Sequence, residues 1–441
     1  MGKRFQSSDG ELIMTLALKR SHLVAAAIVG SVMGYPIASL FSQVTGIENQ
    51  IAAIAMRGAI LACAVTILIG SLRISSRLAV ALFTLFWGGY ILRLAFTFGL
   101  TNEVVSEPAS TFFIWGLGVC LMPSVAVLLY KGHLDFAKMR LTFAILGAVA
   151  MVGILLLGGT AIETAEGQTF DQNRWNLATI NPITIGHLGA SLVLTASAAL
   201  LYEKSKGRRL LFYGAIAGIG LIGLFLANSR GPLVAMAVAI GTYGLAQIRS
   251  KRAWRYSMIV MLGGLVVLYR KTDALFEASG ILDRFARLAT GEDRSAMTRT
   301  ELYSDGIAQF LASPFVGDGL EVRSLGFYPH NVILEAFIAT GVIGGITFLV
   351  LTLMSIRASY RIMKLDSPKA FMALLAMQYI VAGQFSGAIY QAGPMWVLMA
   401  GVLAFSANLK KARPLSAKRS KVIMAKHRQL ASAHVPVHRG K

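Results

Sequence analysis

Three side chains, Arg230, Arg299 and His330, could together carry out chemistry on a phosphate-linked substrate. A guanidinium group is planar and permanently charged, and it can bind two phosphate oxygens at once. A histidine changes its protonation state near neutral pH and can take a proton from an attacking hydroxyl group. These residue types indicate a site that could bind a phosphate group and accept a proton.

Arg230 stands in the stretch Asn228-Ser229-Arg230-Gly231-Pro232, at an expected turn before an apolar segment. Asn228 or Ser229 can cap a helix that begins here, and Pro232 suits its first turn. The N-terminal end of a helix presents free N–H groups and the positive end of the helix dipole, so it can bind an anion. The alternative is that Arg230 only contacts lipid headgroups.

His330 stands in the stretch Pro329-His330-Asn331, directly before an apolar segment that contains Glu335. The histidine is therefore expected at the mouth of a bundle, where it could act as a general base. Asn331 and Glu335 are further candidates for binding a substrate. The alternative is a structural histidine held by hydrogen bonds.

Two more arginines, Arg57 and Arg93, lie within apolar segments. An ionisable side chain inside a membrane span usually faces the interior of the bundle or a polar cavity. With Arg299 from the long segment 271–330, these arginines predict a binding site for a diphosphate.

The composition indicates a membrane protein. Hydrophobic residues make up 55% of the 441 positions and charged residues 14%, whereas soluble proteins carry about 25% charged residues. Apolar runs recur along the chain, each close to the ~20 residues that cross a bilayer as a helix. We predict an all-α fold, a polytopic transmembrane helical bundle of about twelve spans with a helical periplasmic cap loop. The expected spans are 23–44, 51–70, 78–99, 111–130, 141–160, 183–202, 210–227, 232–248, 256–269, 332–354, 370–389 and 394–408.

The net charge of +21 would suit nucleic-acid binding if the chain were soluble. Most basic residues, however, lie in segments on one side of the expected membrane, and most acidic residues lie on the other side. The positive-inside rule then predicts that both termini are cytoplasmic and that residues 271–330 are outside. The charge therefore reflects topology, and no nucleic-acid partner is expected.

Four regions follow from the spans. Residues 1–269 are expected to form spans one to nine, 270–331 a periplasmic loop domain, 332–408 spans ten to twelve, and 409–441 a disordered basic cytoplasmic tail. Such a tail would lie near anionic membrane lipids. The two cysteines fall within expected spans, and no Cys or His spacing suggests a metal site.

The loop domain is too apolar to be a plain linker, and two helices are expected in it, at 273–288 and at 295–312. Ser295 could cap the second helix, and Ser313-Pro314 would end it. Arg299, Tyr303, Ile307 and Phe310 are spaced to share one face. The apolar members of that face are expected to be buried, with Arg299 turned toward the protein.

Several of these stretches resemble the O-antigen ligase and O-antigen polymerase family, over roughly residues 210–355. The resemblance rests on the motifs Ser229-Arg230-Gly231-Pro232-Leu233, Ser313-Pro314-Phe315-Val316-Gly317-Asp318-Gly319, His330-Asn331 with Glu335, and Thr340-Gly341-Val342-Ile343-Gly344. It implies a bacterial inner-membrane glycosyltransferase of lipopolysaccharide or exopolysaccharide biosynthesis. Its donor would be a glycan on undecaprenyl diphosphate, and its active site would face the periplasm.

The resemblance also implies roles for single residues. Arg230 and Arg299 would engage the lipid diphosphate, and His330 would activate the acceptor hydroxyl group. Arg174, in an earlier polar loop, resembles a weaker feature of the family and is a candidate for binding substrate. A glycosyl diphosphate already carries a good leaving group, so we expect direct displacement with inversion, without a metal or another cofactor.

Two questions stay open at the level of sequence. The acceptor could be another lipid-linked glycan, as for a polymerase, or a lipid A-core sugar, as for a ligase. A secondary transporter or a lipid-linked glycan flippase would also explain about twelve spans and the intramembrane Arg93. It would not explain a large cap on one side.

Overall fold

The computed structural model describes residues 7–70, 74, 76–101, 105–130, 132–160, 174–202, 207–247, 294–365, 368–407 and 409. This part of the chain is helical, apart from connecting segments that hold a few isolated β-bridges. The elements are α1 (Ser7–Thr45), α2 (Asn49–Leu68), α3 (Arg77–Gly99), α4 (Ala109–Thr111), the π-helix η1 (Phe112–Leu121), α5 (Met122–Leu129), α6 (Phe136–Leu157), α7 (Pro182–Tyr202), α8 (Arg208–Leu226), α9 (Arg230–Ala246), α13 (Arg294–Ala312), α14 (Val332–Leu365), α15 (Ala370–Ala382) and α16 (Gly393–Ser406).

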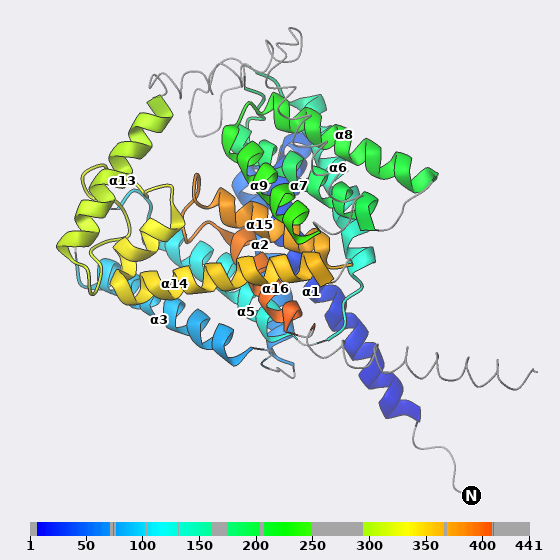
Figure 1. The fold of residues 1–441 in the computed structure, drawn as a ribbon, viewed down its shortest axis with the longest axis horizontal. Helices are drawn as coiled ribbons and strands as arrows, with labels where there is room; N and C mark the ends of the chain where they lie inside the picture. The colour runs from blue at the N-terminus through cyan, green and yellow to red at the C-terminus, as the bar shows by residue number, and fades with distance from the viewer. Residues whose placement is uncertain are drawn as a thin grey trace, which may run out of the picture.

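Eight helical stretches of the described chain are long and apolar enough to cross a membrane. They pack into one bundle (Figure 1), and α7 is the most buried of these eight stretches. Of the most apolar stretch of α7, 83% is buried against other helices, whereas the corresponding share for α2 and α8 is 28%. The chain is therefore an all-helical, multi-pass membrane protein.

Three expected spans appear as helices of 13 to 17 residues. The spans expected at 232–248, 370–389 and 394–408 correspond to α9, α15 and α16. The helix α15 ends at Ala382, because the N–H groups of residues 383–386 turn back to carbonyls of residues 379–382. The expected span at 256–269, the expected helix at 273–288 and the tail from residue 410 lie outside the described residues.

A kink divides α14 into two parts. Gly341 has φ +65° inside the helix, a backbone conformation that glycine adopts without steric cost. The part before the kink begins at Val332, two residues after His330, and the longer part after it runs to Leu365. The kink therefore sets the direction of the short segment that carries Glu335.

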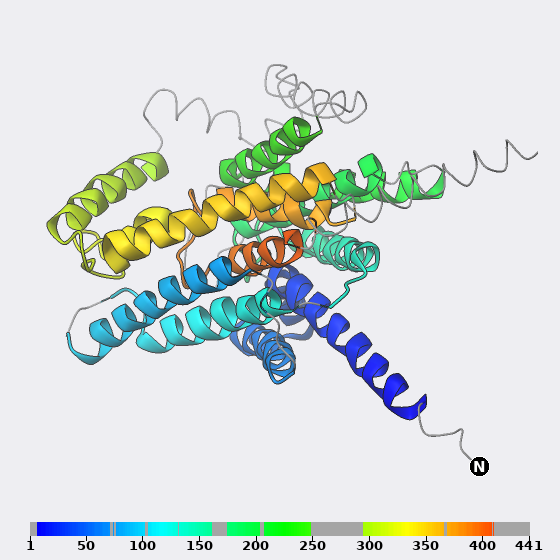
Figure 2. The same ribbon diagram turned by 60° about the horizontal axis from the view of Figure 1, so that its bottom comes forward.

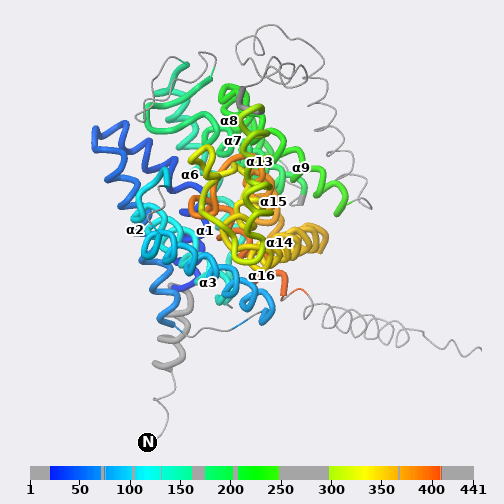
Figure 3. Tube along the Cα trace, turned by 90° about the vertical axis from the view of Figure 1, so that its left-hand side faces the viewer, coloured from blue at the N-terminus to red at the C-terminus, as the bar shows by residue number. Residues whose placement is uncertain are grey.

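The helix α13 lies at one end of the bundle, beside the kinked end of α14 (Figures 1 and 3). The first turns of α1 project on the opposite side (Figure 2). We call the first of these ends the cap end, and α13 with the following residues 313–329 the cap. As expected, α13 ends at Ala312, but Ser295 lies inside the helix and is not its cap.

The buried face of α13 differs from the expected one. Leu302 is 1% exposed and Gly306 lies against Leu334 and Ile338 of α14, whereas Ile307 is 50% exposed. The prediction that Ile307 is buried is therefore wrong. The helix packs through the row at 302, 306 and 310, because the small residue at 306 allows α14 to approach closely.

Candidate active site

His330 stands at the entry to α14 in a strained backbone conformation. Its φ is +55°, which is uncommon for a residue other than glycine and is found mostly at functional or tightly constrained sites. Its ring packs against Tyr328 and Phe327, with ring centres 4.6 and 5.3 Å away. Among the described residues, its Nδ1 atom is buried without a hydrogen-bond partner. The ring is thus held by aromatic contacts, and one of its nitrogens is buried and unpaired among the described residues.

Asn331 forms the cap of α14. Its Oδ1 accepts hydrogen bonds from the N–H groups of Ile333 and Leu334, each 3.0 Å long. This satisfies N–H groups of the first turn that lack partners within the helix. The side chain expected to bind substrate therefore has a structural task, which fixes the position of its neighbour His330.

Arg299 lies close enough to His330 to affect its protonation. Burial, and then the positive charge of Arg299, lower the pKa of His330 to about 4. One turn further along α13, Tyr303 donates a hydrogen bond to the carbonyl of Gln384 at 3.3 Å, and burial raises the pKa of this tyrosine. The structure therefore brings Arg299, Tyr303 and His330 together, with the turn after α15 beside them.

Arg230 is the first residue of α9, as the sequence indicated. Ser229 occupies the cap position, but its side chain makes no capping hydrogen bond. The preceding Asn228 has φ +46°, the second strained residue of this kind in the described chain. The helix α9 packs against α14 and α15, so Arg230 begins a helix next to the elements that hold His330.

Arg174 is buried, with 8% of its surface exposed, and it lies near the turn before Arg230. The N–H of its neighbour Trp175 donates a 2.9 Å hydrogen bond to the carbonyl of Leu226, at the end of α8. An antiparallel bridge between Asn176 and Gly159 fixes the same segment. This contact across the fold places the earlier polar loop beside the α8–α9 turn.

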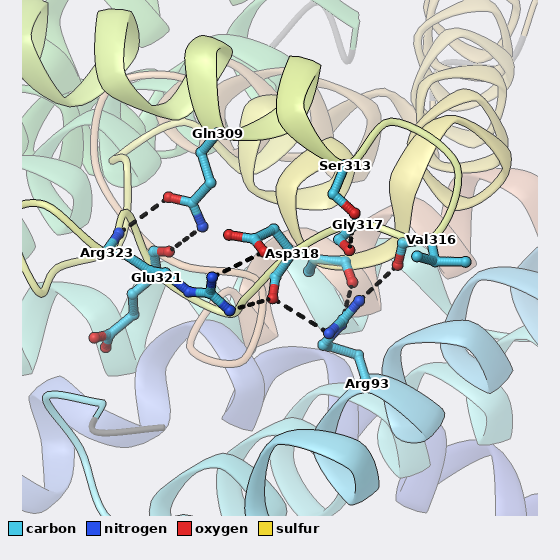
Figure 4. Close-up of polar contacts among 9 residues, drawn as sticks. Arg93, Gln309, Ser313, Val316, Gly317, Asp318, Glu321 and Arg323 are labelled. Atoms are coloured by element: carbon cyan, nitrogen blue, oxygen red, sulfur yellow. Dashed lines mark hydrogen bonds and ion pairs between the residues drawn. The ribbon is translucent and has the colours of Figure 1, made fainter. Parts of the chain in front are cut away.

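Arg93 binds backbone rather than an open cavity (Figure 4). Its Nε donates to the carbonyl of Ala339 at 2.8 Å, its Nη2 to that of Val316 at 2.6 Å and its Nη1 to that of Asp318 at 3.3 Å. One of these carbonyls lies just before the kink of α14, and two lie in the loop after α13. Arg93 therefore joins α3, α14 and the cap.

The loop after α13 is tied to the kink by further hydrogen bonds. The N–H of Asp318 donates to Ile338 at 2.8 Å, and the N–H of Val342 donates to Pro314 at 2.7 Å. A side chain at Gly341 would overlap the carbonyl of Phe315. The two motifs around Gly317 and Gly341 thus form one structural unit.

A second group of polar contacts braces the cap (Figure 4). Gln309 accepts from the N–H of Arg323 and donates to the carbonyl of Glu321, both at 3.0 Å. Arg323 forms an ion pair with Asp318 at 3.0 Å. The Glu321 carboxylate accepts from the backbone and hydroxyl of Ser106, between α3 and α4. Nothing in the sequence pattern pointed to Gln309 or Glu321, because each acts through a partner that is distant or on another segment.

Glu335 and Arg57 are placed inside the protein. Glu335 is 1% exposed and accepts a 2.9 Å hydrogen bond from the N–H of Ile389, so it holds the segment between α15 and α16. The guanidinium of Arg57 lies over the ring of Trp115, 3.6 Å from its centre, as in a cation–π contact. Neither side chain is brought to His330 by a described contact.

The described residues contain no group of three or more His, Cys, Asp or Glu side chains that could hold a metal ion. What they do contain is a histidine with a buried, unpaired nitrogen, an arginine that affects its charge, and a second arginine at the start of a helix that packs against α14 and α15. This arrangement can bind an anion and accept a proton.

Comparison with known proteins gives one family. Residues 215–349 match the family described as O-antigen ligase. The matched segment contains Arg230, Arg299 and His330. No curated protein and no solved structure matches the chain.

Proposed function

We propose that the protein is a membrane glycosyltransferase, a proposal supported by the match of residues 215–349 to the family described as O-antigen ligase. It moves a glycan from undecaprenyl diphosphate to a sugar hydroxyl group of an acceptor. The observation that carries the proposal is the placement of Arg299 beside His330, whose buried Nδ1 has no partner among the described residues. An anion site next to a proton acceptor is what such a displacement requires.

The proposed reaction is a direct displacement. The acceptor oxygen attacks the anomeric carbon and forms the new glycosidic bond, while the bond from that carbon to the diphosphate oxygen breaks. His330 takes the proton of the acceptor hydroxyl, and undecaprenyl diphosphate leaves with the bonding electron pair. Arg299 and Arg230 stabilise the negative charge that grows on the leaving group, and the product has inverted configuration. The reaction needs no metal.

The donor would also prepare the base. In the structure, burial and the charge of Arg299 hold the pKa of His330 at about 4, which makes the imidazole a weak base. A diphosphate bound to Arg299 would offset that positive charge and add negative charge nearby, so it would raise the pKa of His330. The histidine would then become an effective base mainly when the donor is bound.

The proposed topology follows from the charge distribution of the sequence. Both termini would be cytoplasmic, and the cap end would face the periplasm of a bacterial inner membrane. The donor would reach the site from the outer leaflet, and the acceptor would be either a lipid-linked glycan or a lipid A-core sugar.

The test uses the purified protein in proteoliposomes with an undecaprenyl-diphosphate-linked glycan and an acceptor. We expect transfer to be lost in Arg299→Ala, Arg299→Lys and His330→Ala, because a lysine lacks the planar two-pronged group. Arg77→Ala is the matched control. Its side chain is exposed, and it begins α3, at the opposite end of that helix from Arg93.

Three outcomes would contradict parts of the proposal. Full transfer by His330→Ala would remove this residue from the reaction. Loss of transfer on addition of EDTA would contradict a metal-free mechanism. Donor that crosses the membrane without being consumed would favour a flippase or transporter instead.

A further inference from the structure

The cap exposes an apolar surface next to the membrane spans. Its members are Ile307, Leu311, Phe315 and Val316, which are between 50% and 74% exposed. The exposed positions in the preceding turns of α13 include polar residues, Thr300, Glu301 and Ser304. The exposed side of α13 therefore changes from polar to apolar toward residues 313–319, which we call the cap loop.

Hydrogen bonds fix the position of the cap loop relative to the spans. Arg93 of α3 binds the carbonyl of Val316 at 2.6 Å, and the N–H of Val342 in α14 binds the carbonyl of Pro314 at 2.7 Å. Both α3 and α14 are candidate membrane spans. The cap loop therefore lies beside two helices that are themselves expected to be surrounded by lipid.

The exposed surfaces of α3 and α14 are apolar around the positions where these helices bind the cap loop. On α3, Leu92, Phe96 and Leu100 are 72%, 47% and 80% exposed, so the apolar row continues beyond Arg93 to the end of the helix. On α14, Ile343 and Ile346 are 63% and 50% exposed. Phe315 and Val316 thus extend a surface that the spans already present to lipid.

The backbone of the cap loop is suited to this environment. Irregular backbone can lie at membrane depth only if the protein satisfies its polar groups. Arg93 takes the carbonyls of Val316 and Asp318, and α14 takes the carbonyl of Pro314 and the N–H of Asp318. Ser313 and Gly317 bond to each other through the hydroxyl and through the backbone. The carbonyls of Pro314, Val316 and Asp318 are thus bound by the protein, whereas the Phe315 and Val316 side chains are exposed.

We propose that the cap loop enters the membrane leaflet at the cap end and that Phe315 and Val316 contact the acyl chains of its phospholipids. Phenylalanine and valine side chains favour insertion into the apolar core of a membrane. The contact would hold α13, and with it Arg299, at the depth of lipid headgroups. It does not depend on glycan transfer, because it follows from the spans and the cap alone.

The test measures the surroundings of residue 315 in the full-length protein. A Cys63→Ala, Cys120→Ala background allows one cysteine to be introduced at Phe315 or, as the control on the same cap, at Ser304. An environment-sensitive fluorophore is attached and the protein is placed in phosphatidylcholine nanodiscs without any polyprenyl lipid. Emission is then quenched either by a nitroxide on the acyl chain of the lipid or by iodide in the buffer. Size-exclusion profiles show that each variant is folded and monodisperse.

We expect the label at residue 315 to emit at shorter wavelength than the label at 304. The acyl-chain nitroxide should quench the label at 315 and spare that at 304, and iodide should do the reverse. Quenching of residue 315 by iodide would place the loop in water and overturn the proposal. Protection from both quenchers would mean that protein covers the loop, for example a second copy of this chain. If the lipid nitroxide quenches residue 315 only after undecaprenyl diphosphate is added, phospholipid is not the partner. None of these readings requires transfer activity, so they remain separate from the test of the enzyme.

Discussion

Replacing Arg93 by glutamine tests whether this arginine holds the cap or binds substrate. The change removes a charged group that donates to Ala339, Asp318 and Val316. A hydrogen bond from a charged group contributes about 1.5–3 kcal/mol. Counting only the two bonds shorter than 3 Å, and taking the lower value because the side chain is half-exposed, gives about 3 kcal/mol for the junction between α3, α14 and the cap.

That free energy should appear as local opening. A loss of about 3 kcal/mol raises the open population roughly a hundred-fold, if the junction opens as one unit. The N–H groups of Asp318 and Val342, which bridge the cap loop and the kink, should therefore exchange with deuterium faster by that factor. Hydrogen exchange measured by mass spectrometry on protein in nanodiscs reads this directly. Arg77→Gln, an exposed arginine at the other end of α3, is the matched control and should leave the exchange unchanged.

Two outcomes distinguish a structural role of Arg93 from a role in binding substrate. If Arg93→Gln leaves exchange around residues 314–342 unchanged but weakens donor binding, then Arg93 binds substrate, as its intramembrane position suggested. If exchange rises and Arg93→Lys restores it only partly, the multiple hydrogen bonds of the guanidinium are what the junction needs.

Three further predictions concern the entry to α14 and its kink. Because the pKa of His330 is about 4 in the unliganded protein, kcat/KM should stay level down to about pH 5 and fall through about pH 4, as the histidine gains a proton and stops acting as a base. A fall of kcat/KM near pH 6.5, the ordinary pKa of histidine, would contradict the placement of Arg299 beside it. The same depressed pKa makes His330 contribute stability above about pH 6.5 that is lost as the pH falls toward 4. Asn331→Ala should destabilise the start of α14 by about 1 kcal/mol and Asn331→Asp should not, as read from exchange of the first-turn N–H groups; equal loss in both variants would mean that the amide has another task. Gly341→Ala should prevent accumulation of folded protein, because φ is +65° and the added carbon would meet the carbonyl of Phe315. Gly218→Ala, where nothing lies within 4 Å of the added carbon, is the control and should be tolerated. Fluorescence-detected size exclusion distinguishes the two variants, and a normal profile for Gly341→Ala would show that the kink can straighten.

Hydropathy was sufficient to locate the described helices, because burying a helix in lipid depends on the composition of about twenty neighbouring residues. The start of α9 at Arg230 and the end of α13 at Ala312 could also be predicted, since capping residues and proline act locally. The kink at Gly341 could not, because it depends on the cap loop packing against it. Arg93 and Val316 are separated by 223 positions along the chain.

Side-chain roles were harder to predict than positions. Glu335 and Asn331 stand where a substrate could be bound, yet their described partners are the backbone of residue 389 and the first turn of α14. A carboxylate or amide can hold a backbone N–H as well as a ligand, and sequence spacing does not separate the two uses. The buried face predicted for α13 is displaced by about one residue from the observed face. The small residue Gly306, rather than hydrophobicity, decides which row of residues packs against α14.

The bonds of Arg93 also constrain the order in which the protein can be assembled. Val316 is synthesised 223 residues after Arg93, so at 5–20 residues per second α3 exists for tens of seconds before its partner is made. A bare arginine within a span costs about 2.5–3.5 kcal/mol at the centre of the membrane, and less where the side chain can reach the interface. During that interval Arg93 must extend toward water or headgroups, and α3 must be held by its apolar neighbours. The cap can take its final place only when α14 is inserted, so the proposed anion site is completed among the last steps of biogenesis and is absent from a half-made chain.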